Sequence, residues 1–144
     1  MAFRGHFDYS LDAKNRLNIP PKFRAAFSSG LVLARDVDPC LTIWVPEDFE
    51  AHTESFLAGI NPLDPKRRGL QRFFEGNAFD MELDGAGRIT LPPALLERAG
   101  IKKEVVVAGS RDHLEVWDRG RWAKQQDALD KQIEAMAESL GTTG

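Results

Sequence analysis

The chain has 144 residues, of which 42% are hydrophobic and 28% charged, and its formal net charge is −3. This balance is typical of a single folded domain and not of a disordered chain. The single cysteine, Cys40, excludes an internal disulfide and any site built from several thiolates. No apolar run approaches the roughly 18 residues of a membrane span, and the first residues lack a signal-peptide pattern, so we expect a cytoplasmic location.

The charges are unevenly distributed along the chain. Residues 1–35 carry six basic and two acidic groups, whereas residues 36–59 carry six acidic groups and no lysine or arginine. Residues 60–79 are basic again, with four basic and two acidic groups. The N-terminal block would attract a polyanion that the average charge repels, although an ordinary solvated surface would show the same pattern.

An internal repeat organises the sequence. Residues 11–21 read LDAKNRLNIPP and residues 83–93 read LDGAGRITLPP, so both follow Leu-Asp-x-x-x-Arg-apolar-polar-apolar-Pro-Pro at an offset of 72. Trp44 and Trp117 extend the match at an offset of 73. The sequence therefore predicts two copies of one unit, residues 6–50 and residues 79–123.

Each copy is expected to contain two strands, a short helix and two further strands. Apolar-polar alternation predicts strands on both sides of a turn at residues 12–16, paired as a hairpin, and Gly85 and Gly87 are expected to supply positive φ in the second copy. The paired prolines then open short helices at residues 21–27 and 93–99, with Gly100 as a C-cap. Residues 31–33 are expected to pair with 41–45, and residues 105–107 with 114–117.

These elements predict an α+β fold. One copy alone is too short to enclose a core, so we expect the two repeats to interleave as a pseudo-dimer in one closed β-barrel. Residues 51–78 are expected to form a helical connector, and residues 124–144 a C-terminal helix and tail. A heptad-like stripe on that helix should pack on the barrel or on a neighbouring subunit; its members are Trp122, Gln126, Leu129, Ile133, Met136 and Leu140.

No set of residues indicates catalysis. The three histidines lie in different predicted elements without ligand spacing, Cys40 is expected to be a buried structural thiol, and no serine lies in a nucleophile motif. Gly85-Ala86-Gly87 leads into a strand, which favours a hairpin turn over a phosphate-binding loop. We therefore expect no enzymatic activity, metal, cofactor or small-molecule substrate.

The Asp-x-x-x-Arg pairs are the most informative feature. An aspartate before a tight turn can accept backbone N–H bonds and pair with the arginine four residues on. Asp12 with Arg16, and Asp84 with Arg88, are therefore expected to hold the two turns as structural staples. Basic and polar decoration occurs only in the first copy, which favours a binding face there; the candidate DNA-contacting residues are Arg4, Lys14, Asn15, Arg16 and Lys22.

The chain resembles the MraZ family of bacterial transcriptional regulators, which belong to the AbrB-like swapped-hairpin class. The resemblance rests on Phe3-Arg4-Gly5, on both Asp-x-x-x-Arg hairpins, on Trp44 and Trp117, and on the C-terminal helix. The family pattern at the first turn is usually Asp-x-Lys-Gly-Arg. Asn15 replaces that glycine here, and asparagine also tolerates left-handed geometry, so we expect the turn to survive.

This resemblance implies a double-stranded DNA partner and a nucleoid-associated protein. It implies binding upstream of the division and cell-wall gene cluster, repression of that cluster and of the regulator's own gene, and assembly into a ring. Several subunits on closely spaced promoter repeats would gain avidity that one weakly charged face lacks.

Two other classes of function remain open from the residues alone. A protein-interaction or antitoxin-like module could use the same charged face to dock a partner protein, and an enzyme with a non-obvious site is the third. Salt dependence separates DNA binding from docking of a partner protein. The logarithm of DNA affinity falls with the logarithm of salt concentration at a slope of about −0.9 per phosphate contact.

Overall fold

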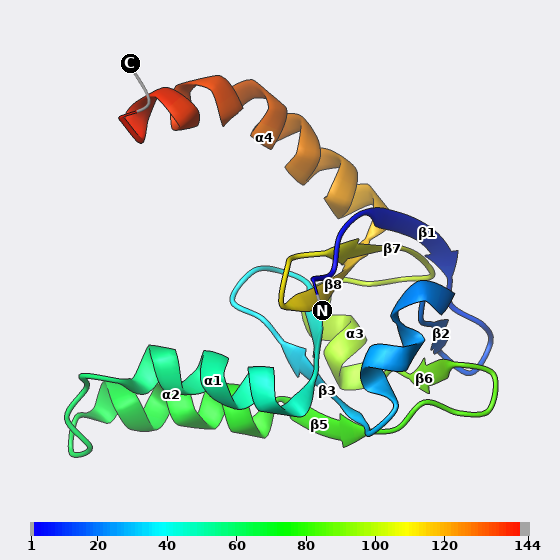
Figure 1. Cartoon of the computed structure of the whole chain (residues 1–144), viewed down its shortest axis with the longest axis horizontal. Helices are drawn as coiled ribbons and strands as arrows, with labels where there is room; N and C mark the ends of the chain where they lie inside the picture. Colours follow the sequence, from blue (N-terminus) through cyan, green and yellow to red (C-terminus); the bar gives the residue numbers. More distant parts are fainter. Residues whose placement is uncertain (1, 142–144) are drawn as a thin grey trace.

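The computed structural model describes residues 2–141 and has an α+β fold (Figure 1). Six strands form one antiparallel sheet in the order β1-β7-β8-β4-β3-β5, and two short strands, β2 and β6, form a separate pair. Among these described residues, no helix combines the length and the apolar character that crossing a membrane would require. Residues 142–144 of the expected tail lie outside the described residues.

The two repeats contain the same elements in the same order. The first has β1 (His6–Ser10), β2 (Arg16–Asn18), the 3-10 helix η1 (Pro21–Phe27), β3 (Leu31–Arg35) and β4 (Leu41–Trp44). The second has β5 (Ala78–Met81), β6 (Arg88–Thr90), α3 (Pro93–Ala99), β7 (Glu104–Gly109) and β8 (His113–Asp118). The helices α1 (Pro46–Leu57) and α2 (Pro65–Gly76) connect the repeats, and α4 (Arg119–Ser139) follows the second.

Strands are exchanged between the repeats. β1 pairs with β7 and β5 pairs with β3, so the first strand of each repeat lies beside the third strand of the other. β2 and β6 pair with each other, with Leu17 opposite Ile89. β4 and β8 are also paired, while β3–β4 and β7–β8 pair within their own repeats as the sequence predicts. The repeats therefore share one sheet.

Two expectations about this sheet were wrong. The strands on either side of the turn at 12–16 do not pair as a hairpin, because β1 makes a five-residue ladder with β7 that the three-residue β2 could not match. The barrel is not closed either: within residues 2–141, β1 and β5 are the edges of the sheet, and β2–β6 stays separate. Pro20 and Pro92 closely follow the short strands and lack the N–H that a longer ladder needs.

Both repeats contribute to one core. Fully buried side chains come from the β2 and β6 segments and from one face of the sheet, among them Leu17, Ile19, Leu33, Ile43, Leu91, Val107, Leu114 and Val116. On the other face, Trp44 packs with Phe49 of α1 in a smaller cluster. Because the main core is drawn from both repeats, the shared packing fixes the positions of both turns relative to each other.

The C-terminal helix contacts the sheet only near its start. Trp122 lies 6.2 Å from Trp117 between ring centroids, and the Arg119 guanidinium donates to the Tyr9 carbonyl at 3.2 Å. No residue of α4 is buried, and the helix extends away from the sheet (Figure 1). The outer part of the predicted apolar stripe therefore does not pack on the described part of its own chain.

Candidate nucleic-acid interface

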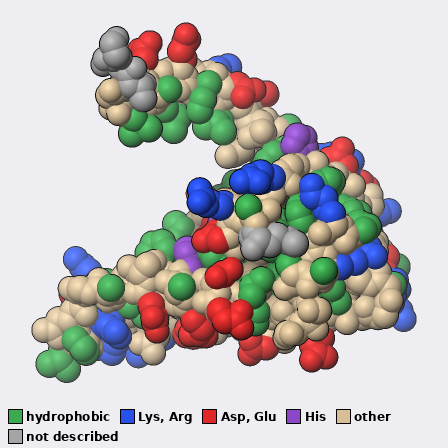
Figure 2. All heavy atoms as spheres, viewed as in Figure 1, with side chains coloured by type: hydrophobic (Ala, Val, Ile, Leu, Met, Phe, Trp, Pro, Cys, Tyr) green, Lys and Arg blue, Asp and Glu red, His purple; other side chains and the backbone are tan. Residues whose placement is uncertain are grey.

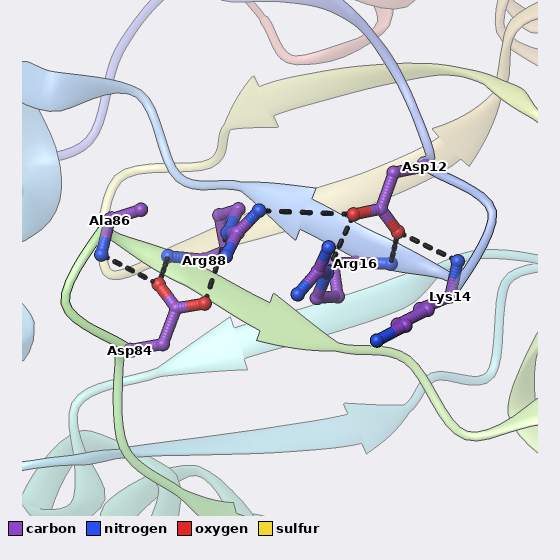
Figure 3. A network of polar contacts seen from close by, with 6 residues as sticks. All are labelled: Asp12, Lys14, Arg16, Asp84, Ala86 and Arg88. Atoms are coloured by element: carbon purple, nitrogen blue, oxygen red, sulfur yellow. Dashed lines mark hydrogen bonds and ion pairs between the residues drawn. The ribbon is translucent and has the colours of Figure 1, made fainter.

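The first turn is held by Asp12 (Figure 3). Its Oδ1 accepts hydrogen bonds from the backbone N–H groups of Lys14 and Arg16, both at 2.9 Å, and its Oδ2 accepts one from Arg16 Nε at 2.6 Å. The backbone N–H of Arg16 is the main reason why the pKa of Asp12 lies below its ordinary value. The Asp12 carboxylate therefore fixes the backbone of the turn and holds the Arg16 guanidinium against the turn.

The second turn repeats this hydrogen-bonding frame. Asp84 Oδ1 accepts from the N–H groups of Ala86 and Arg88 at 2.9 Å, and Oδ2 accepts from Arg88 Nε at 3.0 Å. The pKa of Asp84 is lowered as well, mainly by the backbone N–H of Arg88. Arg88 Nη1 also lies 3.9 Å from Asp12 Oδ2, which links the two networks (Figure 3).

The two turns are further locked by backbone hydrogen bonds between the repeats. Ile19 N–H donates to the Gly87 carbonyl at 3.0 Å, and Leu91 N–H donates to the Asn15 carbonyl at 2.8 Å. Each turn is thus tied to the segment that leaves the other turn. A tip built on such a rigid frame needs little ordering when it meets a ligand.

Asn15 and Gly87 occupy equivalent left-handed positions, with φ of 57° and 78°. Asparagine thus replaces the glycine without loss of the turn, whereas Gly85 is not among the residues with positive φ, contrary to expectation. At Gly87 a Cβ would collide with the Arg24 guanidinium, whose Nε donates to the Ile19 carbonyl at 2.8 Å. A side chain at Gly87 would therefore adopt an unfavourable φ and displace the Arg24 guanidinium from this contact.

The structure brings only some of the candidate DNA-contacting residues together. Lys14 is exposed at the first turn, with Asn15 and Arg16 beside it in sequence. Lys22 lies on η1, where its Nζ is 5.3 Å and 5.0 Å from the ring centroids of Phe7 and Phe23. That position anchors the ammonium group over two aromatic faces.

Arg4 is separated from the first turn. It precedes β1, and the turn follows the other end of that strand, which at about 3.3 Å per residue is about 13 Å long. Arg4 and Lys14 are both exposed, and they lie beyond opposite ends of β1. The structure therefore does not assemble Arg4 with Lys14 into one compact cluster.

Two further basic residues, which the sequence pattern does not predict, lie beside the first turn. Lys102 and Lys103 line a hollow with Asp12, Ala13 and Asn15, because the Leu11 N–H donates to the Lys103 carbonyl at 2.9 Å. Both lysines are exposed. They belong to the second repeat, and only the exchange of β1 onto β7 brings them here. We call Lys14, Asn15, Lys102 and Lys103 the first-turn face.

One group of possible metal ligands occurs in the described part of the chain. Atoms of Asp36, Cys40 and Glu115 lie within 4.8 Å of one another. The Cys40 thiol donates to Asp36 Oδ2 at 3.8 Å, and Glu115 accepts from Trp117 Nε1 at 3.0 Å. Burial raises the pKa of the Cys40 thiol, in keeping with its role as the donor to Asp36. Hydrogen bonds within the protein account for this group.

Comparison with known proteins relates both halves of the chain to one family. A family model described as "MraZ protein, putative antitoxin-like" matches residues 2–73 and again residues 74–141, so the chain consists of two copies of one family unit. Relatives with the name "Transcriptional regulator MraZ" include proteins of Thermomicrobium roseum and Mycoplasmopsis pulmonis. The first is 35% identical over 97% of this chain and 98% of its own length, and the second 37% over 100% and 98%.

A relative of the same name from Nitrosomonas eutropha is 40% identical over 87% of this chain and 86% of its own length. Identity at this level over nearly the full chain agrees with the two family matches. The chain belongs to the MraZ family.

Proposed function

We propose that this protein is a sequence-specific, DNA-binding transcriptional regulator and that the first-turn face contacts DNA. The observation that carries the proposal is the contrast between two turns with the same frame. The first has an exposed Lys14 and a half-buried Asn15 where the second has Ala86 and Gly87. The frame uses only the backbone N–H of Lys14, so the charged side chain of this lysine is available for a contact outside the fold. The relatives of this chain are named as transcriptional regulators, which supports the same conclusion.

The side chains of the first-turn face suit the chemistry of a DNA groove. A lysine ammonium binds a phosphate or the O6 and N7 atoms of guanine, and an asparagine amide can bind the N6 and N7 atoms of adenine. Lys102 and Lys103 add two positive charges beside the tip. Because the turn is rigid, base contacts at its tip would have a fixed direction.

Within this function, we infer that the protein acts at the nucleoid on closely spaced promoter repeats. The proposed targets are the division and cell-wall gene cluster and the protein's own gene, which it represses as a ring-shaped oligomer. Support comes from membership of the family and from the small number of cations on each face. Few phosphate contacts give modest affinity per subunit, and simultaneous engagement of several subunits can raise it by roughly 10²–10⁴-fold.

The test is binding of the full chain to the DNA upstream of its own gene, measured by fluorescence anisotropy over a series of salt concentrations. We expect a steep linear dependence of log affinity on log salt, which Lys102→Ala with Lys103→Ala makes shallower by up to about two units per engaged subunit. Lys131→Ala, on the outer part of α4, serves as the matched control. If the chain does not bind this DNA, or binds it with an affinity that does not depend on salt, docking of a partner protein is favoured instead.

A further inference from the structure

The outer edge of β5 has no partner strand within residues 2–141. β5 pairs with β3 on one side and ends the sheet on the other (Figure 1). The Arg35 N–H donates to the Asn77 carbonyl at 3.1 Å, and this bond fixes the alternation of hydrogen bonds along the antiparallel pair. Phe79 therefore bonds to β3, whereas the backbone N–H and C=O groups of Ala78 and Asp80 point away from the sheet.

Two unpaired carboxylates lie along this edge. Ala78 packs against the small cluster that contains Phe49 of α1, so Asp80, two positions further on, projects from the same face of the sheet. Asp80 and Glu82 are both exposed, and they line a hollow of about 460 Å³ together with Pro46, the first residue of α1. No described residue forms a hydrogen bond or an ion pair with either carboxylate. The fold therefore leaves both charges available to a ligand.

The acidic character of this edge extends to the start of α1. Glu47 and Asp48, in the first turn of that helix, are exposed. Figure 2 shows acidic side chains gathered over β5 and the start of α1. The described residues that line the hollow include no lysine or arginine. This part of the surface therefore repels a polyanion such as DNA and attracts a cationic partner.

The opposite edge of the sheet, formed by β1, differs in this respect. Arg119 Nη1 lies 3.2 Å from Glu104 Oε2, and Arg119 Nε lies 3.9 Å from Asp8 Oδ1, so the acidic groups at that edge are paired within the chain. Arg119 also donates to the Tyr9 carbonyl of β1 at 3.2 Å. Unpaired carboxylates on an edge strand repel a second copy of the same edge but attract a basic strand. Only the β5 edge presents them.

The other face of β5 is apolar. Phe79 and Met81 lie opposite Leu33 and Leu31 of β3, on the face that covers the main core. Phe79 is 41% exposed and Met81 is partly exposed. A strand added to β5 would have two carboxylates beside one of its faces and two apolar side chains beside the other. Cross-strand neighbours of opposite charge and apolar neighbours both stabilise such a pair.

We propose that the outer edge of β5 binds an extended segment of a partner protein in which lysine or arginine alternates with apolar residues. The segment joins the sheet as an antiparallel strand, the orientation of the pairs already present. Its cations lie opposite Asp80 and Glu82, and its apolar side chains lie beside Phe79 and Met81. Main-chain hydrogen bonds give affinity, and the alternation gives specificity. None of these residues belongs to the first-turn face, so the inference does not depend on the proposed DNA contact.

Fluorescence anisotropy with a labelled peptide of alternating lysine and valine tests the surface. The full chain should bind this peptide, and Asp80→Lys with Glu82→Lys should weaken binding by at least about tenfold, because pairs of opposite charge become pairs of like charge. Asp127→Lys with Asp130→Lys, at exposed positions of α4, changes the net charge equally and should bind like the wild type. A wild-type chain that does not bind the peptide, or equal affinities of the two variants, would overturn the proposal.

Backbone methylation of the peptide separates strand addition from a general attraction between charges. In an antiparallel pair, the residue opposite Asp80 exchanges both hydrogen bonds with it, so the lysine N–H groups of the peptide face β5 and the valine N–H groups face away. Methylation of the lysine backbone nitrogens should weaken binding by at least about tenfold, and methylation of the valine nitrogens should have little effect. If the first peptide binds as tightly as the second, or more tightly, the segment does not add to β5.

Hydrogen exchange measured by NMR locates the bound strand. The amide protons of Ala78 and Asp80 should exchange more slowly when the unmethylated lysine-valine peptide is present, because they then donate hydrogen bonds to it. The amides of His6 and Asp8, which point outward from β1, serve as the internal control and should be unchanged. Slower exchange at both edges, at β1 alone or at neither edge would refute the assignment of the site to β5.

Discussion

The turn at residues 12–16 and the turn at residues 84–88 share one hydrogen-bonding frame and differ in what they expose. In each, one aspartate accepts two backbone N–H bonds at 2.9 Å and one arginine Nε bond, at 2.6 Å in the first turn and 3.0 Å in the second. The first turn is tipped by Lys14 and Asn15, the second by Ala86 and Gly87. This contrast separates the part of the repeat that folding requires from the part that is free to acquire a ligand.

The surroundings of the turns increase the contrast. Lys102 and Lys103 adjoin the first turn, whereas the Arg24 guanidinium packs over Gly87 in the second. The guanidinium of Arg24 is engaged with the Ile19 carbonyl and covers the backbone. One turn is therefore open and basic, and the other is closed by a cation that already has a structural contact.

The largest expected effect is on stability, at the glycine of the second turn. Gly87→Ala places a Cβ against Arg24 and forces a left-handed alanine, so we expect a loss of about 2–4 kcal/mol in the free energy of unfolding. Asn15→Gly at the equivalent position should change stability by less than about 0.5 kcal/mol. Urea unfolding of both variants measures the difference, and equal losses would contradict the asymmetry of the two turns.

The next effect is on DNA affinity, at the tip of the first turn. Lys14→Ala should leave thermal stability nearly unchanged, because the side chain is exposed and packs little. A lost phosphate contact would flatten the salt slope by about one unit per engaged subunit, and a lost guanine contact would cost roughly 1–3 kcal/mol at one base position. Anisotropy with the promoter duplex and with single-base variants separates these two cases. Unchanged affinity and slope would move the binding face elsewhere, first to the basic segment 66–72.

A smaller effect is expected from the two paired arginines. Arg88→Ala should mainly lower stability, since Arg88 contacts both Asp84 and Asp12. Arg16→Ala should lower stability and also weaken DNA binding, because it disorders the turn that presents Lys14. Thermal unfolding and anisotropy on the same samples test this. Equal loss of DNA binding in two variants that both remain folded would remove the distinction between the repeats.

The smallest expected effect is on the pH dependence of stability, through the carboxylates of the two turns. The pKa values of Asp12 and Asp84 are lowered in the folded state, so their ionised forms stabilise the fold above the ordinary aspartate pKa. That contribution is lost as the pH falls through the folded-state pKa. Carboxyl NMR titration should give both residues midpoints below the ordinary value of about 3.9. Substituting Arg16 by Ala should raise the Asp12 midpoint more than that of Asp84, and equal shifts would indicate that the two networks titrate together.

The features that the sequence predicted depend on residues close together along the chain. The turns, the left-handed conformation of Asn15 and the helix that ends at the left-handed Gly100 each follow from interactions within about five residues. The pairings of β3 with β4 and of β7 with β8 need only a short connection as well. Such features can be predicted from the sequence because the residues that form them also satisfy their hydrogen bonds.

Tertiary structure decided which strands from different repeats pair and what that pairing places together. β1 and β7 are nearly one hundred positions apart, and either repeat offers apolar strands of similar character, so periodicity cannot choose the partner. That choice left the barrel open and brought Lys103 to Leu11. The same holds for α4, whose heptad-like stripe predicts a packing surface but not what covers it. Only the direction in which the helix leaves the sheet shows that its outer part does not pack on the described part of its own chain, because a surface is covered by whatever the whole fold brings within contact distance.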